Sequence, residues 1–370
     1  MNLSYWEYKT WFSNIDFTIV GSGIVGLNCA LTLKKKHPKA KILVLERGVL
    51  PQGASTKNAG FACFGSISEI LSDLKTNTQQ EVTDLVQKRW DGIQLLRKNL
   101  GDSAIGFQQY GGHELFLDHH EELYISCLDS LNEVNRLLRP VFGKEAFRTH
   151  SNSFQFKGIQ ENYITNNFEA QLDTGKMMAA LLDKVQKSGV IILNTVALEA
   201  FSEKADGVAV TTGAFDFSTQ KLFIATNGFA SQLLNEEVTP ARAQVLITSP
   251  IPNLHIKGTF HLEEGYYYFR NIDNRILLGG GRNLDITGEQ TSEFGHTKQI
   301  QNRLEEILRN SILPNTKFVI ERRWSGIMGV GPQKRPIVKQ VSQNVYCGVR
   351  MGGMGIAIGS LIGRDLADLV

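Results

Sequence analysis

The first apolar pattern along the chain predicts a strand, a tight turn and a helix. Residues 16–20 form a short run rich in β-branched and aromatic side chains, and the glycine-rich segment 21–26 follows at once. Apolar residues then recur at helical spacing as far as Leu33. Residues 41–45 form a second buried-strand pattern that ends in Glu46. The order of strand, helix and strand predicts the start of a parallel α/β sheet.

The later apolar patterns predict further helices, a group of antiparallel strands and a closing strand and helix. The expected helices cover 78–99, 121–138, 295–311 and 356–369, the antiparallel strands lie within 242–281, and the closing strand covers 345–350. Residues 1–14 precede this pattern. We expect their aromatic side chains to pack on the body of the protein, with an oligomer contact as the alternative.

Composition and charge narrow the class of protein. The 370 residues are 42% hydrophobic and 21% charged, which is a balance typical of a folded globular chain. The formal net charge is only +2, so neither nucleic acid nor an anionic membrane is expected as the main partner. The uncharged stretch 17–33 contains glycines and is short for a spanning helix, so we expect no transmembrane segment and a cytoplasmic location.

The cysteines argue against a metal or disulfide framework. They lie far apart, at positions 29, 63, 127 and 347, and none forms a Cys-x-x-Cys pair. This spacing is typical of reduced thiols in a cytosolic protein. We therefore expect no metal site.

The turn at 21–26 has the sequence Gly-Ser-Gly-Ile-Val-Gly, which is typical of a dinucleotide site. Gly21 permits a tight turn, Gly23 leaves room for a pyrophosphate, and Gly26 lets the helix pack against the strand. Free N–H groups at the start of the helix favour phosphate, and the carboxylate of Glu46 can accept the ribose hydroxyls. The cofactor-binding residues expected here are Gly21, Gly23, Ile24, Val25, Gly26, Glu46 and Arg47.

Two further glycine-rich segments favour FAD over NAD, although both cofactors share the first turn. Residues 53–60 form a long loop of small residues with many backbone donors, and a flavin needs such a loop because its ribityl chain runs deeper into the protein. Residues 352–355 form a bare turn before the last helix, whose positive end favours the negative charge of reduced flavin. The residues expected to contact FAD here are Ala54, Ser55, Thr56, Asn58, Ala59, Gly60, Gly352, Gly353, Met354 and Gly355.

The order of these motifs resembles the glycine/D-amino-acid oxidase superfamily of FAD-dependent amine oxidoreductases. The loop at 53–60 looks like that family's Gly-Ala-Ser-x-x-Asn-x-Gly loop, and Trp324-Ser325-Gly326 with the last helix matches its C-terminal segment. The resemblance extends to a middle segment, 172–196, and to the strand and turn at 222–228. It implies that Val196, Thr226, Asn227 and Gly228 also contact FAD.

The resemblance implies an α/β fold in which a Rossmann-type FAD-binding domain is built from discontinuous segments. An inserted α+β substrate domain would contain an antiparallel sheet. The FAD-binding domain is expected at 15–75, 146–230 and 325–370, the substrate domain at 76–145 and 231–324, and an N-terminal extension at 1–14. One branch of the family attaches its flavin through a cysteine in a segment that has none here. We therefore expect non-covalent FAD, although Cys63 and Cys347 could lie close to it.

The reaction implied by the resemblance is oxidation of the CH–NH bond of an amino acid or secondary amine. A hydride passes to flavin N5, and the resulting imine hydrolyses. Such a reaction needs neither a metal nor a nucleophile, so no catalytic acid or base is assigned.

The substrate would be an amine or amino acid, and Arg350 is the expected anchor for its carboxylate because an arginine fork forms two parallel bonds. Tyr266 and Tyr268 alternate along a strand pattern and are expected to line the same cavity. A second arginine of the family is replaced by Met328, which favours a more apolar amine or an anchor supplied elsewhere in the chain.

Three other functions stay open at this point. An FAD-dependent 2-hydroxy-acid dehydrogenase would use the same carboxylate clamp, a related flavin domain modifies tRNA, and a flavoprotein subunit can bind FAD without catalysis. The spacing of motifs does not determine the electron acceptor, which would be oxygen or a quinone.

Overall fold

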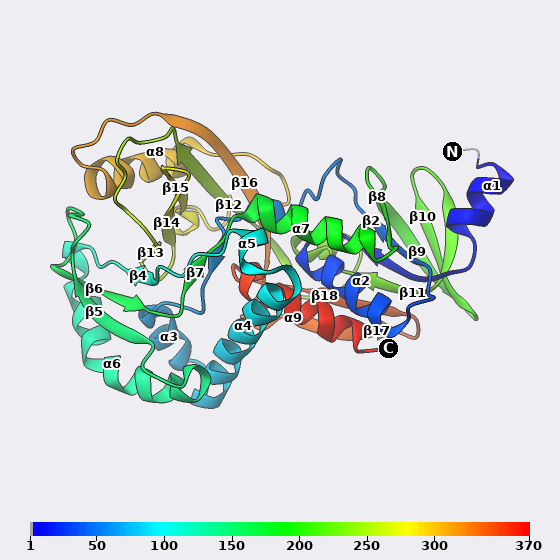
Figure 1. Cartoon of the computed structure of the whole chain (residues 1–370), viewed down its shortest axis with the longest axis horizontal. Helices are drawn as coiled ribbons and strands as arrows, with labels where there is room; N and C mark the ends of the chain where they lie inside the picture. The colour runs from blue at the N-terminus through cyan, green and yellow to red at the C-terminus, as the bar shows by residue number, and fades with distance from the viewer. Residues whose placement is uncertain (1–2) are drawn as a thin grey trace.

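Two eight-stranded sheets divide the structure, a computed structural model that describes residues 3–370 (Figure 1). The first sheet has a parallel centre in the order β18-β11-β1-β2-β8, with β17 antiparallel at one edge and the β9–β10 hairpin beside β11. Its strands are β1 (Ile15–Val20), β2 (Ile42–Leu45), β8 (Ile191–Leu193), β9 (Leu198–Lys204), β10 (Gly207–Thr212), β11 (Asp216–Ile224), β17 (Ile337–Ser342) and β18 (Val345–Val349). Helix α2 (Ile24–Lys36) lies between α7 (Thr174–Lys187) and α9 (Gly355–Ala367) on one face of this sheet.

The second sheet runs in the order β16-β12-β15-β14-β13-β4-β6-β5 and is antiparallel except where β13 pairs with β4. Its strands are β4 (Gly112–Glu114), β5 (Phe147–Ser151), β6 (Asn162–Asn166), β12 (Thr239–Thr248), β13 (Thr259–Leu262), β14 (Tyr267–Ile272), β15 (Arg275–Gly280) and β16 (Ile320–Val330). The remaining helices are α3 (Ile67–Leu74), α4 (Gln79–Leu100), α5 (Asp102–Ile105), α6 (Glu121–Phe142) and α8 (Lys298–Ile307). Between the sheets, β3 (Phe61–Ala62) pairs with β7 (Ala170–Gln171).

Most periodic segments of the sequence form the expected elements. Helix α4 matches the segment 78–99, and α6 begins at the expected residue but continues past Pro140. The domain limits differ in two places. Strands β5 and β6 fall within 146–230, yet they belong to the second sheet because β6 pairs with β4, and β16 crosses the expected limit at 325. No helix within the described residues is long and apolar enough to cross a bilayer.

Glycines in α9 bring the last helix very close to the first long one. A Cβ at Gly363 would lie 2.5 Å from the carbonyl oxygen of Val25, and a Cβ at Gly359 would lie 2.9 Å from Cγ2 of Ile24. Interiors are close-packed, so larger residues at these positions would push the helices apart. The glycine turn after β1 and the C-terminal helix are therefore held in one rigid unit.

Among residues 3–14, Phe12 is buried against the body and Leu3 is partly buried there. Helix α1 (Tyr5–Glu7) continues into a π-helical turn, Tyr8–Phe12, and the ring centroid of Phe12 lies 4.3 Å from that of Phe215. The other four aromatic side chains, Tyr5, Trp6, Tyr8 and Trp11, are 46% to 69% exposed. The expectation that these aromatics pack on the body was wrong for them, because so short a helix presents only one face to the sheet.

Candidate functional site

A cavity of about 850 Å³ lies between the carboxyl ends of the first sheet and one face of the second. Its wall combines residues at the ends of β1, β2 and β11 with residues of β12, β13 and β16. Small-molecule sites typically hold about 300–1,000 Å³, so this cavity suits a large ligand. Ligands of open parallel sheets bind beyond the carboxyl ends of the strands, and this cavity lies there.

The glycine turn after β1 forms one end of the cavity. Gly21 has a φ of +105°, and a Cβ there would lie 2.8 Å from the carbonyl oxygen of Ala225. A Cβ at Gly26 would collide with the carbonyl oxygen of Gly21. The amides of Gly23 and Val25 have no hydrogen-bond partner within residues 3–370, and no side chain caps α2. These free amides and the positive end of the helix suit an anionic phosphate.

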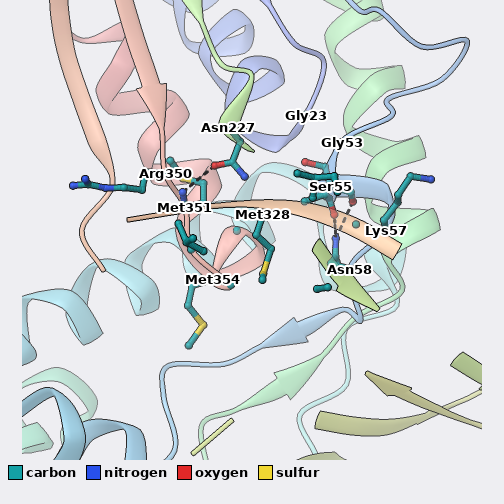
Figure 2. Close-up of a pocket in the computed structure, with 18 of the residues that line it drawn as sticks. Gly23, Gly53, Ser55, Lys57, Asn58, Asn227, Met328, Arg350, Met351 and Met354 are labelled. Carbon is teal, nitrogen blue, oxygen red and sulfur yellow. Dashed lines mark hydrogen bonds between the residues drawn. The ribbon is translucent and has the colours of Figure 1, made fainter. Parts of the chain in front are cut away.

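The loop at 53–60 lies against the start of α2. Ser55 Oγ accepts a hydrogen bond from the amide of Ile24 at 3.0 Å. Asn58 fixes the shape of the loop, because its Nδ2 donates to the carbonyls of Ala54 and Ser55 while its Oδ1 accepts from the amide of Gly60. Figure 2 shows Ser55 and Asn58 together at one side of the pocket. The loop is thus an ordered wall of small residues beside the phosphate position.

The carboxylate of Glu46 is buried at the edge of the cavity and is held by the backbone. Its Oε2 accepts from the amide and the hydroxyl of Ser22, at 3.2 and 2.6 Å, and its Oε1 accepts from the amide of Gly48 at 2.9 Å. The Glu46 carbonyl accepts from the amide of Val196, which lines the cavity beside it. These donors fix an acceptor group where a ribose is expected.

The turn at 352–355 brings a second helix start to the same cavity. Asn227 Oδ1 accepts from the amide of Met351 at 3.0 Å, and the amide of Gly352 donates to the carbonyl of Gly329 (Figure 2). No side chain caps α9. The amides of Gly353 and Gly355 have no partner among the residues that the structure describes. The start of α9 is therefore a second positive helix end that faces the cavity, in addition to the start of α2.

FAD fits the groups that this cavity presents. One uncapped helix start suits the pyrophosphate, the other suits the electron-rich edge of a flavin, and the Glu46 carboxylate beside the first turn suits a ribose. The residues that would hold the cofactor are Gly21, Gly23, Ile24, Val25, Glu46, Arg47, Ala54, Ser55, Asn58, Ala59, Val196, Thr226, Asn227, Gly352, Gly353, Met354 and Gly355, which all line the cavity. The other expected contacts, Gly26, Thr56, Gly60 and Gly228, do not line it. At Gly26 and Gly228 the backbone of another segment is too close for any side chain.

One face of the second sheet forms the opposite wall. Cross-strand pairing places His261, Tyr268, Gly279, Val245 and Trp324 in one row across β13, β14, β15, β12 and β16. The ring of Tyr268 lies over Gly279, where a Cβ would be 2.6 Å from Cε2 and 2.7 Å from the hydroxyl oxygen. Directly paired antiparallel residues present their side chains to the same face. The row therefore forms a wall, and its members His261, Tyr268 and Val245 line the cavity.

Arg350 and Met328 lie at the same end of the cavity but point differently. Arg350 has a φ of +64°, and its Nε and Nη1 donate to the carbonyls of Arg335 and Glu237 at 3.0 and 3.2 Å. Figure 2 shows its side chain pointing away from Met328 and Met354. The guanidinium therefore links two loops, and the structure does not bring it together with Tyr268. Its role as a carboxylate anchor stays a prediction.

Tyr266 and Tyr268 both line the cavity, but they differ in burial. Tyr266 precedes β14 and is 41% exposed, so it lies at the mouth of the cavity, which Arg282 also lines. Tyr268 lies within β14 and has its ring against the sheet, and burial raises the pKa of its phenol to about 12. Of the two, Tyr268 is the more buried, and contact of either residue with a substrate stays a prediction.

The sequence reasoning missed several residues of the cavity wall, and His261 is the most informative of them. Its Nε2 lies 3.2 Å from Glu169 Oε2. Burial opposes a charge on the ring, but the hydrogen bond and charge of Glu169 outweigh it and raise the pKa of His261 to about 9. Position 261 lies between two apolar residues of a short strand, Phe260 and Leu262, and this alternation is the signal that could have identified it. The other lining residues missed include Phe61, Glu69, Arg89 and Arg282, while Cys63 lines the cavity as the sequence allowed and Cys347 does not.

A second acid lies beside His261, away from the cavity. Glu114 pairs with His261 across β4 and β13, and both of its oxygens accept from Ser68, one from the amide at 3.0 Å and one from the hydroxyl. Burial raises the pKa of Glu114 to about 7, against the effect of these hydrogen bonds. Burial also raises the pKa of the Cys63 thiol, so this cysteine is protonated at neutral pH.

The chain is similar to known proteins over almost its whole length. It is 21% identical to the probable oxidoreductase OrdL of Haemophilus influenzae, with 98% of this chain and 84% of the relative covered. It is also 21% identical to the gamma-glutamylputrescine oxidoreductase of Escherichia coli, covering 96% and 83%. The crystal structure of glycine oxidase from Geobacillus kaustophilus superposes with a TM-score of 0.76 at 18% identity, covering 96% and 94%, which shows a shared fold.

The family comparison agrees with the cavity. The family model for FAD dependent oxidoreductases matches residues 16–369, which include both glycine turns and both sheets. The resemblance that the motif order suggested is confirmed, and so are the Rossmann-type fold and the FAD cofactor. This chain belongs to the family of FAD-dependent oxidoreductases, and it is an enzyme.

Proposed function

We propose that this enzyme oxidises the CH–NH bond of an amino acid or a secondary amine, giving an imine that water then hydrolyses. The observation that carries this proposal is the continuity of one cavity from the two helix starts to the row of His261 and Tyr268. A small substrate lying on that row shares its space with the ligand of the glycine turns. Two similar proteins support the class, since one is named for glycine and the other for gamma-glutamylputrescine.

Bound FAD supplies the acceptor for the two electrons and the hydrogen that leave the substrate carbon. The part of the protein itself is to hold that carbon in place and to keep bulk water away. Tyr268 and Phe61 meet edge to face with ring centroids 5.6 Å apart, and Val245 continues this wall. An apolar wall of this kind favours the neutral form of an amine over the ammonium ion, and the neutral form is the one that reacts.

An anaerobic reduction assay tests the proposal. The purified holoenzyme is mixed with D- and L-amino acids, N-methyl amino acids, larger secondary amines and 2-hydroxy acids, while the absorption band of oxidised flavin is followed. We expect rapid bleaching by one class of amine and none by the matched hydroxy acids. Bleaching by 2-hydroxy acids alone would replace amine oxidation with the hydroxy-acid reaction, and bleaching by neither would refute both.

The same samples address the electron acceptor. Air is admitted after bleaching, and the return of the oxidised band is timed beside a parallel sample that receives a soluble quinone analogue. We propose that oxygen or a quinone reoxidises the flavin. Recovery in air within seconds would indicate an oxidase, whereas recovery with the quinone alone would indicate a dehydrogenase.

A further inference from the structure

One buried cationic group on the cavity wall, His261, is not among the residues assigned above to the cofactor. His261 is 5% exposed and lines the cavity from the middle of β13. Its Nε2 is engaged by Glu169, but its Nδ1 has no hydrogen-bond partner among residues 3–370. Nδ1 is thus unpaired, but it is not buried away from solvent. A ring nitrogen of His261 is therefore available to a ligand in the cavity.

The orientation of this histidine is fixed from behind. Glu169 is 1% exposed, and its second oxygen, Oε1, accepts from the amide of Phe64 at 3.0 Å. The same carboxylate passes directly over Gly112, where any side chain would collide with it. The ring of Phe61 meets His261 edge to face at 5.4 Å. The histidine is held by a buried acid that the backbone itself positions.

Several charged and titratable groups surround the ring. Glu69 of α3 and Glu114 of β4 add to the effect of Glu169, whereas His113 of β4 opposes a second positive charge. Tyr268 of β14 is the cross-strand neighbour, and Cys63 and Arg89 line the same cavity. With a pKa of about 9, the imidazole carries a proton on both nitrogens at neutral pH. Nδ1 then donates, and it does not accept.

Three other cations of this wall have partners elsewhere, whereas Arg282, which also lines the cavity, is the alternative anchor. Arg350 donates to two backbone carbonyls, Arg89 donates to the carbonyl of Phe64, and Lys334 pairs with Asp73. Met328 contributes an uncharged thioether to the cavity wall. A buried carboxylate needs a charged or hydrogen-bonding partner, because its desolvation is costly.

We propose that His261 binds the carboxylate of the substrate through Nδ1–H, with Glu169 as the group that keeps the ring charged and oriented. This inference rests on the proposed function in one respect, namely that a small substrate occupies this part of the cavity. The hydroxyl of Tyr268 lies further along the row, over Gly279, and faces another part of the same molecule. His261 thus selects substrates that carry an anionic group near one end.

The test uses two probes of equal shape, benzoate and its uncharged amide, benzamide. Their binding to the holoenzyme is measured by calorimetry and by the change in flavin absorption, which require no turnover. We expect benzoate to bind more tightly than benzamide, and we expect His261→Gln to weaken benzoate about 10- to 100-fold with little effect on benzamide. The matched control is His255→Gln, the same substitution at an exposed histidine of the same domain. Equal loss for both probes, or no loss, would overturn the proposal.

The pH dependence separates a binding role from a structural one. In the native protein, benzoate affinity should be constant below a pH of about 9 and fall above it, because the His261 ring then loses the proton on Nδ1 and with it the positive charge. Glu169→Gln removes the charge that supports protonation, so the fall should move to a lower pH. A flat profile in the native protein, or an unmoved midpoint in Glu169→Gln, would contradict the assignment even if His261→Gln fails to fold.

Failure of this inference is distinguishable from failure of the proposed function. If amines bleach the flavin while benzoate binding ignores His261, the enzyme is an amine oxidoreductase with another anchor, and Arg282 at the mouth is the next to test. If benzoate selectivity depends on His261 while no amine bleaches the flavin, the histidine still binds carboxylates and the reaction is a different one.

Discussion

Gly23→Ala would place a methyl group at the floor of the phosphate site. The new Cβ would lie 2.9 Å from Ser55 Oγ, so the serine must retreat by several tenths of an ångström. The same oxygen accepts the hydrogen bond of the Ile24 amide, and losing that bond costs about 1 kcal/mol. A phosphate displaced from one helix amide loses a further 1.5–3 kcal/mol or so. The first loss lowers the stability of apoprotein and holoenzyme alike, so only the second weakens binding, and FAD should bind about 10- to 150-fold more weakly.

Titration of apoprotein with FAD, followed by quenching of flavin fluorescence, measures this change directly. The melting temperature of the apoprotein checks that the fold survives. Gly175→Ala is the matched control, because its Cβ approaches only the side chain of Asp173, outside the cavity. Unchanged FAD affinity in Gly23→Ala would refute the phosphate assignment. If the double variant Gly23→Ala/Ser55→Gly bound FAD as tightly as the native protein, the loss of affinity would come entirely from the contact with Ser55 and not from the phosphate.

Three further predictions concern the wall and the core. Acid precipitation of the holoenzyme should release all FAD into the supernatant, because the pKa of the Cys63 thiol is raised and a thiolate is disfavoured; yellow colour left in the pellet would contradict non-covalent binding. The pKa of Glu114 is raised from 4.5 to about 7, so the folded state binds its proton more tightly and stability falls as pH rises between these values, by up to about 3 kcal/mol. Glu114→Gln should reduce that fall in urea titrations at pH 5 and pH 8, and an identical fall in both proteins would count against the burial effect. Arg350→Ala should lower the melting temperature while leaving the KM for carboxylate substrates within about twofold, because the guanidinium links two loops; an unchanged melting temperature with a large rise in KM would restore Arg350 as the anchor.

The cofactor end of the cavity could be predicted from the sequence because its residues are close together in the chain. Gly21, Gly26 and Glu46 belong to one strand, turn, helix and strand, and the spacing of that unit is fixed by backbone geometry. The C-terminal turn was predictable for the same reason, since three glycines directly precede a helical pattern. Both segments line the cavity as expected.

The substrate end could not be predicted in this way, because its contacts join distant segments. His261 meets Glu169, 92 residues earlier, only because β13 pairs in parallel with β4 and β4 pairs with β6. The direction of Arg350 depends on its positive φ and on the carbonyl of Glu237, 113 residues away. No periodicity in the sequence encodes such pairings, and the placement of β5 and β6 in the second sheet escaped prediction for the same reason.

The tight packing of α9 against α2 has a consequence for how the enzyme is made. The second helix start, at Gly353 and Gly355, is synthesised roughly 330 residues after the first phosphate-binding glycines. At about 5–20 residues per second, the ribosome needs roughly 20–70 s to cover that distance. Until β18 and α9 have been synthesised, the surfaces of β11 and α2 that they cover in the folded protein stay exposed. Cofactor loading therefore waits until both helix starts have been synthesised, and a shortage of FAD would leave folded apoprotein.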